Sequence, residues 1–145
     1  MSLKIAMAAD HAGFELKEGI KAYLEGKGAE VLDLGTYSTD RVDYPEYGAA
    51  CGRAVAEGKA PLGIVCCGSG IGISMAANKI HGIRCALVTS DFAAEMCKRH
   101  NDANIIAFGG RTTSLEDACR WTDMWLNAEF EGGRHTERVN LLNNL

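Results

Sequence analysis

The residues best suited to chemistry in this 145-residue chain lie in the stretch CCGSGIG, where Cys67 is followed by Gly68, Gly70 and Gly72. Successive glycines let backbone N–H groups approach a ligand closely. A helix that starts there adds unpaired N–H donors and the positive end of its dipole, which favour a bound anion and a nearby thiolate. A thiolate beside such a loop can attack carbon or remove a proton. The alternative is a tight turn in which Cys67 is a small buried apolar residue.

Other polar residues could serve the same chemistry. Asp10 and His11 follow an apolar, strand-like segment, as Cys67 does, and Ser69 adds a hydroxyl within the loop. Each also has a structural alternative, since Asp10 could cap a helix and His11 could satisfy loop backbone groups. His100 could equally interact with a helix C-terminus.

Two arginines near the C-terminus have the spacing of neighbours on a helix. Arg134 and Arg138 are four residues apart, so they share one face if the segment after the Gly-Gly pair is helical. Two guanidinium groups on one face suit a phosphate. The alternative is a solvated basic face.

Hydrophobic periodicity predicts strands alternating with helices. The expected strands are 3–8, 31–34, 62–66, 84–88 and 105–108, and the expected helices are 14–27, 45–57, 71–79, 91–100 and 115–127. This alternation predicts one α/β domain over residues 1–145, with a five-stranded parallel sheet between two helical layers. Ligands of such sheets bind beyond the carboxyl ends of the strands. The polar residues expected to gather there are Asp10 and His11, Cys67 with its loop, Ser90 and Asp91, and residues 109–111.

The helix expected at 115–127 has two apolar stripes. It follows a capping-box-like start formed by Ser114 and Asp117. Trp125 belongs to one stripe and Trp121 to the other, which is more apolar surface than one domain easily buries. This pattern predicts a homo-oligomer.

Composition excludes several classes of function. The net charge of −4 and the lack of a basic run argue against nucleic-acid binding, and no apolar run is long enough to span a membrane. The six cysteines show no CxxC pair and no metal-ligand spacing, so we expect reduced thiols, no metal and a cytoplasmic protein without a signal peptide.

A nonenzymatic dinucleotide-binding module is a further alternative for the function of this chain. However, the glycine loop reads GxGxG, with Ile73 in place of the third glycine of GxGxxG.

Motifs along nearly the whole chain resemble the ribose-5-phosphate isomerase B family, which includes isomerases of allose and galactose phosphates. They are AADHAGFELK at 8–17, DYPEY at 43–47, CGSGIGISMAANK at 67–79, KRHNDANIIAFGGR at 98–111 and EGGRHTERV at 131–139. The resemblance implies a Rossmann-like fold and a cofactor-free, metal-free aldose-ketose isomerase that acts through a cis-enediolate. Ribose 5-phosphate and ribulose 5-phosphate are the implied substrates, with allose 6-phosphate or galactose 6-phosphate as the alternative.

The resemblance also implies a role for each site residue. Cys67 would be the base, and His100 the acid that opens the sugar ring, with Asp10 positioning the sugar. The loop would bind the enediolate oxygens, and its members are Gly68, Ser69, Gly70, Ile71 and Gly72. Within this loop, Ser69 would move protons between the oxygens.

The remaining implied positions bind substrate. They are Asn101 and Arg111 for the sugar, and His11, Arg134 and Arg138 around the phosphate. The family pattern places this site between two subunits, so we expect a homodimer, with a tetramer left open. Another branch of the family uses a glutamate where this chain has Ile73, so Cys67 assigns the chain to the cysteine-using branch.

Overall fold

The computed structural model describes residues 2–145, and strands and helices alternate in it as the sequence predicts. The strands are β1 (Lys4–Ala9), β2 (Glu30–Asp33), β3 (Leu62–Cys67), β4 (Cys85–Leu87) and β5 (Ile105–Gly109). The helices are α1 (Phe14–Gly26), α2 (Tyr44–Ala56), α3 (Ile71–Asn78), α4 (Asp91–Arg99), α5 (Leu115–Asn127) and α6 (Arg134–Asn143). The segment with Arg134 and Arg138 is therefore helical.

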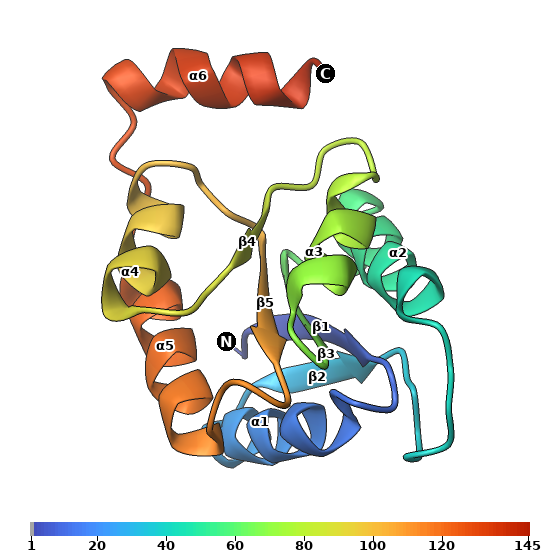
Figure 1. Cartoon of the computed structure of the whole chain (residues 1–145). Coiled ribbons are helices and arrows are strands. Elements are labelled where there is room, and N and C mark those ends of the chain that lie inside the picture. Colours follow the sequence, from blue (N-terminus) through green and yellow to red (C-terminus); the bar gives the residue numbers. More distant parts are fainter. Residues whose placement is uncertain (1) are drawn as a thin grey trace.

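The strands form one parallel sheet in the order β2-β1-β3-β5-β4. Side chains of β1 alternate between the faces, because Ile5 and Met7 join one hydrophobic cluster and Ala6 and Ala8 join the other. Helices α1, α4 and α5 cover the first face, and α2 and α3 cover the second (Figure 1). The predicted three-layer α/β/α fold is confirmed.

The strand order creates a crevice at the carboxyl edge of the sheet. From β1 the chain goes to β2 on one side, and it then returns past β1 to β3 on the other side. The loops after β1 and β3 consequently diverge, which is where open α/β sheets bind ligands. Asp10 and Cys67 lie at these two strand ends.

A different group of predicted site residues lies at the amino edge of the sheet. Helix α4 runs back from the carboxyl end of β4 to the amino end of β5, so His100 and Asn101 reach this edge. Helix α6 lies outside both helical layers, beyond the amino end of β5 (Figure 1). Its last residue, Asn143, accepts a hydrogen bond from Arg84, which directly precedes β4.

Helix α5 buries the tryptophans of both its apolar stripes within one chain, and the homo-oligomer expected from these stripes stays a prediction. Trp121 and Trp125 from the two stripes are both buried in the same cluster, with 8% and 0% of their surface exposed. Trp121 stacks on Phe108 of β5, and its Nε1 donates to Asp91 of α4 at 2.7 Å. Helix α4 and the sheet therefore cover most of the apolar surface of α5 within one chain.

The two remaining structural findings concern membranes and thiols. Over residues 2–145, each helix is too short or too polar to cross a bilayer. All six cysteines lie in this range and are free thiols.

Candidate active site

The loops after β1, β3 and β5 enclose a cleft of about 620 Å³ at the carboxyl edge of the sheet. The predicted site residues that line it are Asp10, His11, Cys67, Gly68, Ser69, Ile71, Gly72 and Arg111. Two of the loops are joined by backbone hydrogen bonds, from Gly110 N to Cys67 O at 2.7 Å and from Arg111 N to Gly68 O at 3.0 Å. The structure thus brings a thiol, a carboxylate, an imidazole and a guanidinium into one hollow.

Cys67 is the last residue of β3, and it lines this cleft although only 4% of its surface is exposed. Its Sγ accepts a hydrogen bond from Gly70 N at 3.2 Å, an arrangement complementary to a thiolate. The preceding Cys66 belongs to the cluster on the opposite face of the sheet, and burial raises the pKa of its thiol. Of the two neighbouring thiols, Cys67 is the one that can meet a ligand.

The glycine loop leads into α3 through a left-handed residue. Gly70 has a φ of +79° and is the N-cap of α3, which begins at Ile71. The Oγ of Ser69 accepts a hydrogen bond from Ile71 N at 3.2 Å. A compact loop at a helix start can direct N–H groups at an anion in the cleft.

Replacing Gly70 with alanine is expected to lower the free energy of unfolding by about 2 kcal/mol or more. The left-handed backbone disfavours any side chain, and an added Cβ would lie 2.8 Å from the carbonyl carbon of Phe108 and 2.7 Å from Leu87 Cδ1. Urea denaturation measures this change. The control is Gly26→Ala in α1, where an added Cβ meets nothing within 4 Å; equal effects at both sites would contradict the steric argument.

Asp10 and His11 each hold a backbone segment as well as lining the cleft. Asp10 Oδ1 accepts hydrogen bonds from Ala12 N at 2.9 Å and Gly13 N at 3.0 Å, at the turn before α1. His11 Nδ1 lies 3.2 Å from both the N and the O of Val42, so the tautomer decides which bond forms. Asp10 is therefore not the helix cap that the sequence allowed, because Gly13 is the N-cap of α1, whereas His11 does lie at hydrogen-bond distance from loop backbone.

The sequence interpretation assigned no role to four further residues that line the cleft, which are Ala12, Tyr44, Met75 and Thr112. The Tyr44 ring lies directly over Gly72, where an added Cβ would be 2.5 Å from Cε1. Tyr44 belongs to the DYPEY motif, which was the available signal for it. Met75 is one turn after Ile71 on α3 and carried no signal.

The predicted residues His100, Asn101, Arg134 and Arg138 are not among those lining the Cys67 cleft. The ring of His100 stacks on His135 of α6, with centroids 4.3 Å apart and planes 16° apart. Glu131 faces both rings, at 3.9 Å from His100 Nε2 and 3.7 Å from His135 Nε2. The His100 segment and the first turn of α6 thus form one unit at the amino edge.

Two features of this unit were not foreseen from the sequence. The buried Nε2 of His135 has no hydrogen-bond partner in the described part of the chain, and burial together with the charge of His100 lowers the pKa of His135. Potential metal-ligating atoms of His100, Glu131 and His135 lie within 4.8 Å of one another. However, the two imidazole rings are stacked and nearly parallel, so their nitrogen lone pairs do not converge on one point.

Comparison with known proteins agrees with this architecture. The family model described as Ribose/Galactose Isomerase matches residues 5–142. Ribose-5-phosphate isomerase B of Escherichia coli is 48% identical over 136 residues, which cover 94% of this chain and 91% of that protein.

Solved structures extend the match to three dimensions. A ribose 5-phosphate isomerase of Thermotoga maritima is 44% identical, with a TM-score of 0.97 over 100% of both chains. Ribose-5-phosphate isomerase B of Mycoplasma genitalium, solved with bound ribulose 5-phosphate, is 36% identical, with a TM-score of 0.93 over 99% of this chain and 96% of that one. The match of sequence and fold over almost the whole length shows that this chain belongs to the ribose/galactose isomerase family.

Proposed function

We propose that this chain is an aldose-ketose isomerase that interconverts ribose 5-phosphate and ribulose 5-phosphate, with Cys67 as the base. The observation that carries the proposal is the position of Cys67 in the cleft, with Gly70 N directed at its sulfur and the glycine loop around it. Isomerisation needs a base beside the C1–C2 bond and donors for the charge that develops on oxygen. This cleft supplies both.

The chemistry transfers one proton between neighbouring carbons. The Cys67 thiolate removes the proton from C2 of the open-chain aldose, and the electron pair moves into a C1–C2 double bond while charge develops on the carbonyl oxygen. Backbone N–H groups of the loop from Gly68 to Gly72 stabilise this enediolate. Ser69 moves a proton between the two oxygens, and Cys67 returns its proton to C1, which yields the ketose.

The other half of the site comes from a second copy of the chain. His100, Asn101, Arg134 and Arg138 lie at the amino edge, so they cannot serve the Cys67 cleft at the carboxyl edge of their own chain. In a homodimer they face the partner's cleft, where His100 is the acid that opens the sugar ring and Asp10 positions that ring. Arg134, Arg138 and the cleft residue His11 bind the phosphate, and Asn101 and Arg111 bind the sugar. We place this enzyme in the cytoplasm, where its thiols stay reduced.

The direct test is a coupled assay of the purified protein on ribose 5-phosphate and allose 6-phosphate. We expect kcat/KM for the pentose phosphate to be at least about tenfold higher, because an additional hydroxymethyl group must find room in a site built for the shorter sugar. A preference for allose 6-phosphate would reassign the substrate to a hexose phosphate. Absence of turnover of both sugars would overturn the proposed function.

A further inference from the structure

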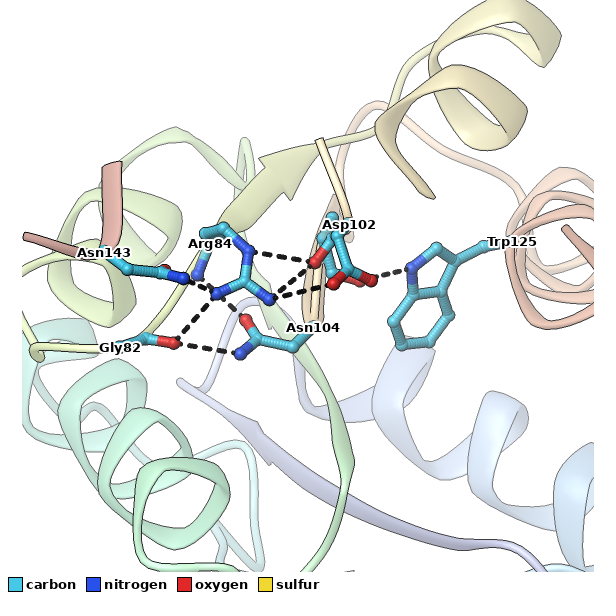
Figure 2. Close-up of polar contacts among 7 residues, drawn as sticks. Gly82, Arg84, Asp102, Asn104, Trp125 and Asn143 are labelled. Atoms are coloured by element: carbon cyan, nitrogen blue, oxygen red, sulfur yellow. Dashed lines mark hydrogen bonds and ion pairs between the residues drawn. The ribbon is translucent and has the colours of Figure 1, made fainter. Parts of the chain in front are cut away.

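One side chain, Arg84, joins the two segments that carry the amino-edge half of the proposed site. Its Nη1 donates to Asn143 Oδ1 in the last turn of α6 at 2.8 Å (Figure 2). Its Nε and Nη2 donate to the carbonyl oxygen of Asp102 at 3.0 and 2.9 Å. Asp102 follows directly after Asn101, so the guanidinium connects the His100–Asn101 segment to the helix that bears Arg134 and Arg138.

The geometry of these contacts requires an arginine. The same guanidinium lies 3.4 Å from Gly82 O and 3.6 Å from Asp102 Oδ2, so each of its nitrogens has a partner on this surface. Only 15% of the Arg84 side chain is exposed. A planar fork can bind Asp102 and Asn143 at once, whereas a lysine ammonium is a single point that cannot reach both.

The loop held by Arg84 has an unusual backbone. Asp102 has a φ of +48°, in the left-handed region that residues with a side chain rarely adopt. This conformation turns the Asp102 carbonyl toward the guanidinium, and the two hydrogen bonds to that carbonyl help to hold it there. The position of His100 and Asn101 at the start of this loop therefore depends on the contact with Arg84.

Helix α6 depends on the same contact at its far end. Near its start, His135 stacks on His100, and in its middle Val139 is buried. The last turn is held through Asn143, and His81 Nδ1 lies 3.2 Å from Leu145 O just beyond it. Because α6 lies outside both helical layers, these few contacts decide its direction.

The backbone beneath the guanidinium has separate support. Asn104 Oδ1 accepts from Arg84 N at 2.8 Å, and Asn104 Nδ2 donates to Gly82 O at 3.0 Å (Figure 2). Trp125 Nε1 donates to Ala103 O at 3.0 Å. None of these bonds uses the guanidinium, so the sheet edge can remain folded when that group is removed.

We propose that Arg84 is a positioning residue of the isomerase site, which sets the spacing between the His100–Asn101 segment and the arginines of α6. This inference rests on the proposed function, in which both segments reach the substrate in the partner's cleft. Arg84 itself does not touch the substrate. Its effect arises because a ring-opening acid and a phosphate clamp act on one sugar phosphate and must keep a fixed separation.

The first test is steady-state kinetics of Arg84→Met on ribose 5-phosphate. We expect kcat/KM to fall roughly 10- to 100-fold, and Arg84→Lys to give little recovery. Asn143→Ala frees only α6, so it should raise KM with kcat nearly unchanged. The control is Arg53→Met, an exposed arginine of α2, which should behave as wild type. If the Arg84→Met enzyme folds and has wild-type kinetics, the proposal is overturned. If that variant does not fold, a wild-type KM for Asn143→Ala overturns the proposal instead.

The second test separates positioning from general damage. The test uses a hybrid dimer of one Cys67→Ala subunit and one Arg84→Met subunit. In one of its two sites, the Arg84→Met subunit supplies a cleft that keeps Cys67, and the Cys67→Ala subunit supplies an amino edge that keeps Arg84. We expect this hybrid to recover about half of the wild-type rate per dimer. The comparison is a hybrid of Cys67→Ala with His100→Asn. If that hybrid recovers activity and the Arg84→Met hybrid does not, the proposed role of Arg84 is overturned but the shared site is not. No recovery in either hybrid would reject the shared site and this inference with it.

Discussion

Replacing Cys67 with alanine is expected to lower kcat for the isomerisation of ribose 5-phosphate by about 10²- to 10⁴-fold, because this variant lacks the proposed base that moves the proton. The protein should stay folded, since the change removes one sulfur atom from a side chain at the edge of the core. Binding of ribulose 5-phosphate should persist, because the loop donors and the proposed phosphate-binding residues are intact. The coupled assay measures the first effect, and calorimetric titration with ribulose 5-phosphate measures the second.

The neighbouring Cys66 offers a matched control within the same strand. Its side chain points to the opposite face of the sheet and is fully buried, and burial raises the pKa of its thiol, so it stays protonated and away from the substrate. Cys66→Ala should therefore retain nearly full kcat despite some loss of stability. Full activity of Cys67→Ala would show that Cys67 is not the base, and equal inactivity of both variants would show that the loss is not specific to Cys67.

The second large effect is expected from two inactive variants combined in one molecule. His100→Asn should lower turnover of ribose 5-phosphate about 10²- to 10⁴-fold, because this variant lacks the proposed ring-opening acid. In a hybrid dimer of Cys67→Ala and His100→Asn subunits, one site contains both defects and the other contains neither. The hybrid should regain about half of the wild-type rate per dimer.

This experiment needs hybrids of defined composition. Two different affinity tags, one on each co-expressed variant, allow sequential purification of the mixed dimer. The control is a hybrid of Cys67→Ala with Ser69→Ala, because both changes fall in the same half of the site and each cleft then retains a defect. A rate no higher than that of this control would refute the arrangement in which His100 serves the partner's cleft.

Most secondary structure followed from local patterns that tertiary packing did not override. The start of α5 was predicted from Ser114 and Asp117, and Ser114 Oγ accepts a hydrogen bond from Asp117 N at 3.1 Å. Helix α2 begins at Tyr44, one residue before the predicted start at Pro45. Caps and prolines act within one turn of chain, so the order of the residues is sufficient to predict them.

The surface of α5 shows what local patterns leave open. The sequence shows that Trp121 and Trp125 lie on different stripes, but it does not show which neighbouring elements cover them. Phe108 and Asp91, which contact Trp121, are 13 and 30 residues away in sequence. The strand order, which places β5 and α4 beside α5, is set by the summed packing of many distant residues rather than by α5 itself.

The sequence by itself determined which residues could do the chemistry and which strands and helices carry them. It placed Asp10 and Cys67 at strand ends, and parallel strands bring such ends to one edge. Only the tertiary structure decided that His100 and the helix bearing Arg138 meet at the opposite edge, because contacts between residues far apart in sequence, such as His100 with His135, hold α6 there. It also revealed that Arg84, which no motif of the sequence singled out for chemistry, joins the two segments of that edge.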